Sequence, residues 1–390
     1  MVSARIHRGV DMPKESISDK KMQDQTVLAA LIPALFNKAL NLSKTDRIAE
    51  AIAVYGDLDQ TLEGITDPAL LSYSAMALAN QASCFRLLQQ TEAEISSYDR
   101  LIQRFQDTSE IELQVYVGKS LFDKAVLLSQ ANRYDEAIDC YDDLIERFSD
   151  YSMPLLQSGV AKALFNKASL FSKMEQTEKA IACCDVLLNQ FIDNPDPCFE
   201  KIIANTLLNK AGCLEKLKNF AETVSAYDRF LDHFLQSEDE ELQLCVAIIF
   251  VKKAEALKEN NQLEESLAVY NTMIARFQDN LEEKIALHLA KGYFNKADIL
   301  CRLQRREEEI KTYTLFINRF IKTEDPSLQI GIATALIKKA TNLVALGRIE
   351  EAISCYDTLL TALDSEENQE LQKYHILADK EKQALVTVQS

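Results

Sequence analysis

The chain has 390 residues with 9 Gly, 7 Pro and no Trp, and its 60 acidic against 43 basic residues give a formal net charge of -17. So few turn-forming residues argue against a β-sandwich or a glycine-rich nucleotide-binding loop and favour an all-α chain. The acidic balance argues against nucleic acid and an anionic membrane surface as partners, because both gain affinity from clustered Lys and Arg.

The nine cysteines are scattered along the chain without a C-x-x-C pair. This usage is typical of small buried residues in a reducing compartment rather than of a disulfide framework. The N-terminus lacks the apolar run of a signal peptide, and no later stretch is apolar over the length that spans a membrane. The sequence therefore predicts a cytoplasmic protein without a membrane-spanning segment.

In chain order, residues 1–22 match nothing else in the sequence and are predicted to be disordered. From residue 23 to residue 364 the sequence repeats every 43 residues, which gives eight units without insertion or deletion. An invariant alanine column consists of Ala39, Ala82, Ala125, Ala168, Ala211, Ala254, Ala297 and Ala340. A tyrosine column with one exception consists of Tyr55, Tyr98, Tyr141, Cys184, Tyr227, Tyr270, Tyr313 and Tyr356. An aromatic or leucine column consists of Leu62, Phe105, Phe148, Phe191, Phe234, Phe277, Phe320 and Leu363.

Each unit has the periodicity of two helices. In the third unit, apolar residues recur at spacings of three and four from Leu113 to Leu128, which predicts a first helix of about 20 residues. Asn132 and Arg133 interrupt the pattern, and a second helix of about 15 residues is predicted to end at Phe148. The unit is therefore an antiparallel helix pair.

Several first helices carry a start signal. Asp67-Pro68, Asp196-Pro197 and Asp325-Pro326 occupy the same two columns, which predicts an Asp N-cap followed by Pro at the first helical position. Pro33 lies inside the first helix of the first unit and is expected to kink or shorten it. Residues 365–390 begin in the phase of another first helix but are more polar, as expected of a C-terminal capping helix.

The segment from residue 121 to residue 145, LFDKAVLLSQANRYDEAIDCYDDLI, resembles the tetratricopeptide repeat through Ala125, Leu128, Ala137 and Tyr141. The period of 43 residues exceeds the family's usual 34, Leu144 replaces a small residue, and the family's terminal proline is absent. Glu94 and Glu309 also replace the small residue of the second helix in two units. The resemblance thus implies an extended 43-residue variant of the family: a right-handed α-solenoid whose first helices line the concave surface.

Catalytic and metal-binding residues are not evident. The four histidines are far apart in the sequence and show no metal-ligand spacing. Cys183 and Cys184 are adjacent, but Cys184 belongs to the tyrosine column and is expected to be buried. The sequence therefore predicts neither an active site, nor a metal, nor a cofactor.

An asparagine column precedes the alanine column by two residues. It consists of Asn37, Asn80, Asn166, Asn209 and Asn295, and is interrupted by Asp123, Lys252 and Lys338. Asparagine is a poor helix former, so its recurrence needs a reason. By the family resemblance, these amides can hold the backbone of an extended peptide in the concave groove. The alternative is that each amide hydrogen-bonds to a neighbouring helix or loop.

A lysine column follows directly after the asparagine column. It consists of Lys38, Lys124, Lys167, Lys210, Lys253, Lys296 and Lys339. One interpretation is a positive stripe for an acidic peptide, in which Lys167 and Lys210 join the asparagines as candidate peptide-binding residues. The favoured interpretation is internal pairing, since a long Lys stem can cover apolar surface while its amine reaches a carboxylate. The carboxylates would be those of Asp99, Asp142, Asp185, Asp228 and Asp357.

The function favoured by this sequence is a non-enzymatic interaction scaffold whose concave groove binds a protein segment, either an extended peptide or a helix. The alternative is a constitutive accessory or regulatory subunit of a larger complex, which engages through an end or the convex surface. An enzyme is disfavoured because the regular repeats leave no loop insertion to house an active site.

Overall fold

A computed structural model describes residues 25–280, 282–363 and 368–389. Within these residues the structure has 17 α-helices, one short 3-10 helix and no strand. The predicted all-α solenoid architecture is therefore confirmed. Segment 1–22, predicted to be disordered, lies outside the described residues.

The contacts divide the chain into two compact units, Met1–Ile203 (unit 1) and Ala204–Ser390 (unit 2). The helices of unit 1 are α2 (Gln25–Lys44), α3 (Ile48–Thr61), α4 (Pro68–Leu87), α5 (Thr91–Phe105), α6 (Ile111–Gln130), α7 (Tyr134–Phe148), α8 (Pro154–Lys173), α9 (Thr177–Phe191) and η1 (Pro197–Phe199). Helix α10 (Glu200–Lys216) contains the boundary. The further helices of unit 2 are α11 (Phe220–Phe234), α12 (Glu240–Glu259), α13 (Leu263–Phe277), α14 (Glu283–Arg302), α15 (Arg306–Phe320), α16 (Pro326–Ala345), α17 (Ile349–Ala362) and α18 (Gln369–Gln389).

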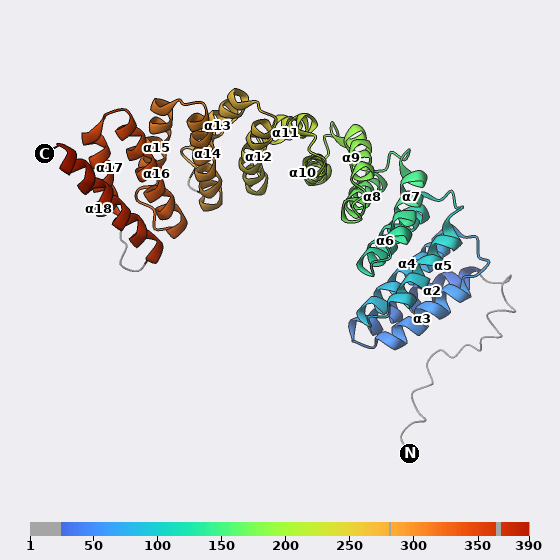
Figure 1. Ribbon diagram of the computed structural model, residues 1–390. Coiled ribbons are helices and arrows are strands. Elements are labelled where there is room, and N and C mark those ends of the chain that lie inside the picture. Colours follow the sequence, from blue (N-terminus) through green and yellow to red (C-terminus); the bar gives the residue numbers. More distant parts are fainter. Residues whose placement is uncertain (1–24, 281, 364–367, 390) are drawn as a thin grey trace, which may run out of the picture. The chain divides into compact units, whose positions relative to one another are not determined.

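Within each unit the helices form two layers, which can be followed in Figure 1. From α2 to α9 and from α11 to α18, each helix packs against the next along the chain, as α6 does against α7. The even-numbered first helices also contact one another directly, for example α4 with α6 and α12 with α14. The odd-numbered second helices form the other layer. The predicted lengths are confirmed in the third repeat, where α6 has 20 residues and α7 has 15.

The alanine and tyrosine columns form the core of this arrangement. All eight alanines of the alanine column are 0% exposed, because each lies where the first helix approaches its neighbours most closely. The tyrosine column is also buried; Tyr141 is 1% exposed. Cys184, which replaces the tyrosine in the fourth repeat, is buried as predicted.

Aspartate caps several first helices as the sequence predicts. The Asp67 carboxylate accepts a hydrogen bond from the Ala69 amide at 2.9 Å, and Asp325 accepts one from Leu328 at 2.8 Å. These contacts satisfy amides that have no partner inside the helix.

The expectation that Pro33 shortens α2 is wrong, whereas a kink at Pro33 stays a prediction. The helix has 20 residues, as many as α4. A proline removes one helical hydrogen bond, here to the carbonyl of Ala29. Ala29 is exposed, so that water can take the place of the missing donor.

The turn between the two helices of a repeat has the same backbone conformation in all eight copies. One residue lies in the left-handed region, and these residues are Asp46, Gln89, Asn132, Glu175, Lys218, Asn261, Gln304 and Gly347. The amide that follows it closes the turn, as Arg133 does by donating to the Leu128 carbonyl at 2.9 Å. Glycine alone adopts this conformation without steric cost, yet only one of these eight turns has a glycine at this position.

Glutamine and arginine side chains close several of the loops that precede a first helix. The Gln157 amide donates to the carbonyls of Ser149 at 2.9 Å and Phe148 at 3.3 Å. Gln114 and Gln243 make equivalent bonds in their own loops. These side chains satisfy carbonyls at the end of the preceding second helix, where the helix dipole favours positive charge. The extra length of the 43-residue unit is thus ordered by its own side chains.

Arginine reaches the same helix ends from the following repeat. The Arg104 guanidinium donates to the carbonyl of Leu62 at 2.5 Å and pairs with the fully buried carboxylate of Asp59. Arg319 donates to the Asn280 carbonyl at 2.5 Å. Each contact joins a second helix to the C-terminal end of its predecessor, and so fixes the register of neighbouring repeats.

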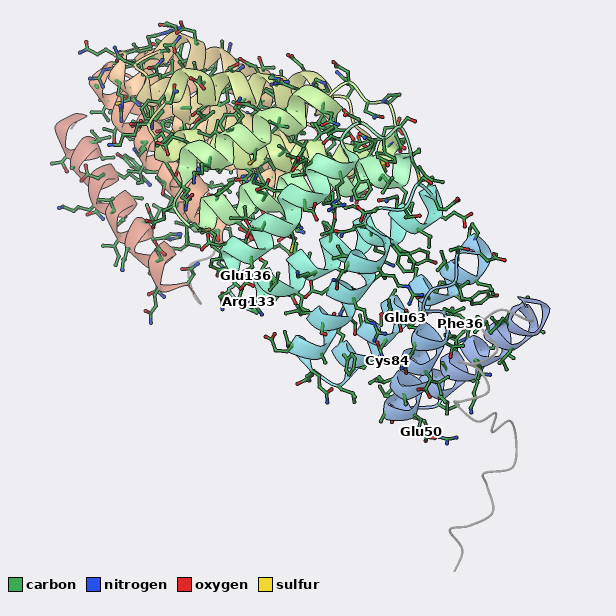
Figure 2. The ribbon with its side chains drawn as sticks, turned by 90° about the vertical axis from the view of Figure 1, so that its right-hand side faces the viewer. Phe36, Glu50, Glu63, Cys84, Arg133 and Glu136 are labelled. Atoms are coloured by element: carbon green, nitrogen blue, oxygen red, sulfur yellow. The ribbon has the colours of Figure 1, made fainter. Side chains whose placement is uncertain are left out.

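Exposed ion pairs follow the turns from repeat to repeat. Arg133 pairs with Glu136 of its own helix at 2.6 Å, and the two side chains lie together in Figure 2. The same guanidinium reaches Glu92 of the preceding repeat at 3.1 Å. Pairs this exposed add little stability each, so the ladder contributes orientation more than energy.

We expect Lys218→Gly to raise the free energy of unfolding by about 1 kcal/mol. Lys218 has a φ of 56° and its side chain is exposed, so the substitution removes backbone strain without removing packing. Urea denaturation followed by circular dichroism measures the change. Lys218→Ala, which keeps the strain, serves as the control and should have little effect.

Gly347→Ala should lower the free energy of unfolding by about 1 kcal/mol. The added Cβ meets no atom within 4 Å, so the only cost is conformational. Destabilisation by Lys218→Gly would contradict this account of the turn.

Stability should also fall at alkaline pH through the tyrosine column. Burial raises the pKa of Tyr141 to about 12, whereas tyrosine in an unfolded chain ionises near pH 10. Because the native pKa is raised, the contribution is complete below about pH 10 and is lost as the pH rises through about 12. One such tyrosine should cost the wild type about 2 kcal/mol at about pH 11.5. Urea denaturation of the wild type and of Tyr141→Phe, below about pH 10 and again at about pH 11.5, tests this prediction. If the difference in unfolding free energy between the two proteins did not change with pH, the raised pKa of Tyr141 would be refuted.

Candidate functional site

A cavity of about 240 Å³ lies between the first helices α4 and α6, and it is lined by Asn80 of the asparagine column and by Asp123, which interrupts that column. We call the surface between successive first helices the first-helix groove. The cavity is lined by Met76, Ala79, Asn80, Ser83, Tyr98, Tyr116, Lys119, Ser120 and Asp123. Asn80 enters from α4 and Asp123 from α6, while Tyr98 comes from the second helix α5. The cavity is therefore bounded by three helices of unit 1 and is mostly polar.

Charged groups surround the cavity. Burial raises the pKa of Asp123, while the positive charges of Lys119 and Arg86 act in the opposite direction. Burial, reinforced by Asp123, also raises the pKa of Tyr98 above that of a free tyrosine. The phenol of Tyr98 therefore stays protonated at neutral pH, and its hydroxyl donates to the Glu94 carboxylate at 3.4 Å.

The buried Glu94 does not disturb the packing of this region. It pairs with Arg86 at 2.7 Å, and Arg86 also donates to the Tyr98 hydroxyl at 2.7 Å. The carboxylate that replaces a small residue in the second helix is thus neutralised beside the cavity, as buried charges require. In the other repeat with this replacement, Glu309 is 4% exposed and lies beside Tyr313, whose pKa is raised by burial and by that carboxylate.

Two other asparagines of the column use their amides internally. Asn166 donates to the Tyr141 hydroxyl at 3.1 Å, and Asn295 donates to the Tyr270 hydroxyl at 2.9 Å and to Glu255 at 3.1 Å. Each amide thereby joins a first helix to the preceding second helix. For these two positions the structure shows the hydrogen-bonding alternative.

The remaining members of the column differ from one another. Asn37 is exposed. Asn209 accepts a hydrogen bond from the Cys213 thiol at 3.6 Å and has further interactions. Lys252, which interrupts the column, pairs with Glu215 at 3.3 Å. The column therefore provides no uniform ladder of free amides.

The lysine column lies on the opposite side, between successive second helices, a surface that we call the second-helix groove. Here Lys124 pairs with Asp99 at 2.5 Å, Lys167 with Asp142, and Lys253 with Asp228. Lys382 of α18 continues the column and pairs with Asp357 at 2.5 Å. Internal pairing is thus what the structure shows for these lysines. Lys210 on α10 also has an interaction partner.

The candidate residues therefore do not form a single site. Adjacent helix positions differ by about 100° around the axis, so Asn166 and Lys167 point into different grooves. Asn80 is brought together with Asp123 and with residues that the sequence did not single out, Tyr98, Tyr116 and Lys119. Lys119 stands four residues before Asp123, on the same face of α6, and this spacing could have indicated it. Nothing in the sequence indicated that the Tyr98 hydroxyl reaches the cavity, and the peptide-binding role of the seven candidates stays a prediction.

Two further observations concern the described residues alone. No three His, Cys, Asp or Glu side chains among residues 25–280, 282–363 and 368–389 lie close enough to hold a metal ion. In the same segments, no helix combines the length and apolar character needed to cross a membrane.

Comparison with known proteins gives matches at two levels. Two family models described as tetratricopeptide repeat match residues 119–151 and residues 161–185. A search of curated protein sequences gives no match.

Solved structures resemble the chain at low sequence identity. A tetratricopeptide repeat protein from Parabacteroides merdae has 15% identity and a TM-score of 0.36, with 78% of this chain and 98% of that chain covered. The apo form of RapI has 12% identity and a TM-score of 0.45, with 92% and 99% covered. The TPR2AB domain of yeast Sti1, in a complex with pHSP90, has 18% identity and a TM-score of 0.33, with 78% and 98% covered. Scores this low carry no argument about ligands.

The family assignment rests on the matched segments. Each match runs from a first helix into its second helix, α6 into α7 and α8 into α9. The alanine column is buried in both matched segments, and it continues at the same spacing through all the remaining repeats. The matched segments are therefore tetratricopeptide repeats, and they occur here in a unit of 43 residues.

Proposed function

We propose that the chain is a non-enzymatic scaffold that binds a segment of a partner protein in the first-helix groove of unit 1. The presence of tetratricopeptide repeats supports a protein-interaction scaffold in general terms. The finer proposal places the anchor of the bound segment in the cavity between α4 and α6.

The observation that carries the proposal is the polar lining of this cavity. Asn80 makes no side-chain hydrogen bond to any part of the chain that the structure describes, unlike Asn166 and Asn295. Its amide can therefore donate to and accept from a peptide backbone, which presents one donor and one acceptor per residue. Lys119 and Asp123 add one charge of each sign on the facing helix.

This lining favours a ligand of modest charge. A cavity with both a cation and a carboxylate gains little from a strongly charged side chain, because attraction to one group is offset by repulsion from the other. The matching partner is the backbone of an extended segment with a polar uncharged side chain seated beside Tyr98 and Tyr116. Bound water would leave as the backbone amides replace it.

A second candidate is a constitutive subunit that engages through the C-terminal end. Its supporting observation is the apolar surface of α18, where Ile376 is 71% exposed and Val386 is 49% exposed. Large apolar side chains this exposed are typical of a surface that a partner covers, when they are contiguous.

We expect Asn80→Ala combined with Lys119→Ala to weaken binding of a groove ligand by about tenfold or more, since two polar contacts to the segment are lost. The probe is a dodecapeptide selected by phage display on the full chain, and fluorescence polarisation gives its dissociation constant. Lys38→Ala removes the same charge at an exposed position of unit 1 and should leave binding unchanged. A selected peptide that binds the double variant as tightly as the wild type would overturn the proposal.

The second candidate predicts a different result. The tagged full chain, purified from its native host, should retain one partner at a fixed ratio, and Ile376→Asn should release it because the exposed apolar contact is lost. Quantitative mass spectrometry measures the ratio. If the Ile376→Asn variant kept the partner and the Asn80 and Lys119 double variant lost it, the first-helix groove would be favoured as the binding surface instead.

A further inference from the structure

The lysine column of the second-helix groove lacks its carboxylate in two adjacent repeats of unit 2. Where the pairing is intact, the aspartate stands 25 residues before the lysine, as Asp228 does before Lys253. At the equivalent position, Asn271 precedes Lys296 and Thr314 precedes Lys339. Neither Lys296 nor Lys339 forms an ion pair with any residue that the structure describes.

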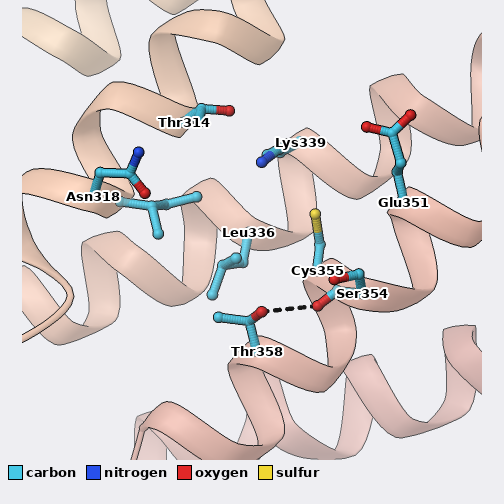
Figure 3. Close-up of a pocket in the computed structure, with 9 residues that line it drawn as sticks. Thr314, Asn318, Leu336, Lys339, Glu351, Ser354, Cys355 and Thr358 are labelled. Atoms are coloured by element: carbon cyan, nitrogen blue, oxygen red, sulfur yellow. Dashed lines mark hydrogen bonds between the residues drawn. The ribbon is translucent and has the colours of Figure 1, made fainter.

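A cavity of about 230 Å³ surrounds Lys339 and opens where the aspartate stands in other repeats. Its lining comes from α15, α16 and α17 and consists of Thr314, Ile317, Asn318, Leu336, Lys339, Glu351, Ser354, Cys355 and Thr358. Figure 3 shows the Lys339 amine directed toward Thr314 and Asn318 of α15. The short threonine side chain leaves the space that a carboxylate fills beside the paired lysines.

The nearest acidic group of the cavity is already engaged. Glu351 accepts a hydrogen bond from Arg348 on each carboxylate oxygen, both at 2.6 Å. In Figure 3 its carboxylate lies on the far side of Lys339 from Thr314. The Thr358 hydroxyl donates to the Ser354 carbonyl at 2.8 Å. The Thr314 hydroxyl likewise donates to the Ile310 carbonyl at 2.8 Å. The lysine amine and the Asn318 amide remain as donors for a ligand.

The neighbouring repeat adds positive charge of the same kind. Lys296 is half-buried, and its pKa is lowered chiefly by burial, with Lys311 and Arg305 acting in the same direction and Glu308 against them. Lys311 projects from α15 one turn before Thr314 and forms no ion pair among the residues described. The second-helix groove over α14, α15 and α16 is therefore locally basic in a chain of net charge -17.

We propose that this cavity binds a carboxylate side chain of an acidic partner segment, with Lys339 as its cation, Asn318 as a hydrogen-bond donor, and the space beside the short Thr314 side chain as the place of the carboxylate. The paired repeats show the chemistry directly, since the same lysine position binds one aspartate carboxylate in each of them. A single ammonium beside an existing glutamate suits a monoanion better than a phosphate dianion, which is usually held by several basic groups. Lys296 and Lys311 would attract further acidic residues of the same segment.

This site is separate from the proposed groove of unit 1, and it uses the other layer of helices. The two proposals can therefore fail independently. If both hold, the chain presents one surface for a largely uncharged segment and another for an acidic one, and so can connect two partners.

The test uses the full chain and a fluorescein-labelled hexaglutamate amide at about 0.15 M salt, where long-range repulsion is screened. We expect Thr314→Asp to raise its dissociation constant by about tenfold or more, because the new carboxylate occupies Lys339 as Asp228 occupies Lys253. Gln103→Glu on α5 adds the same charge at an exposed position and should have no effect. Lys339→Met gives a second disabling variant.

A complementary variant should create the site elsewhere. Asp228→Thr reproduces the Thr314 arrangement beside Lys253, and we expect a second binding event for hexaglutamate in a titration. Equal binding by wild type and Thr314→Asp, or no binding at all, would overturn the proposal. Inorganic phosphate that displaces the probe at lower concentration than acetate would overturn the carboxylate assignment. The Asn80 and Lys119 double variant should bind the probe normally, which separates this proposal from the first-helix groove.

Discussion

Close packing at the alanine column is the constraint on which the rest of the structure depends. A fully buried alanine in every repeat adds little side-chain volume, so that the first helix can pack closely against its neighbours. The left-handed turn after each first helix and the glutamine contacts in the following loop hold the chain length between these points constant. Regular spacing then follows, and each column of residues keeps its orientation along a unit.

This regularity separates the polar columns onto two surfaces. The asparagine position faces the first-helix groove, whereas the lysine position one residue later faces the second-helix groove. In several repeats the chain uses one or both positions for itself. Asn166 and Asn295 donate to tyrosine hydroxyls, and lysines such as Lys167 pair with an aspartate of the preceding second helix. This internal use is interrupted at Asn80 on one surface and at Lys339 on the other, and these are the places where we propose that ligands bind.

The sequence predicted the features that depend on spacing along the chain. Helix pairs, buried columns and the Asp67 and Asp325 caps follow from local periodicity and local hydrogen bonding. The cavity at Asn80 was not predicted, because its walls come from three helices and depend on where the Tyr98 hydroxyl ends. The length of α2 was misjudged, since the effect of Pro33 depends on whether water can solvate the carbonyl that loses its helical donor. The pairing of Lys167 with Asp142 was foreseen as one of two alternatives, and a structure was needed to decide between them.

The central claim is that a protein segment binds across the first helices of unit 1. Hydrogen–deuterium exchange of the full chain, with and without a peptide selected on it, measures this most directly, because it reports protection helix by helix. The account predicts slower exchange in α4 and α6 when the peptide is bound, with the second helix α7 unchanged. Protection confined to the second helices or to α18 would contradict it.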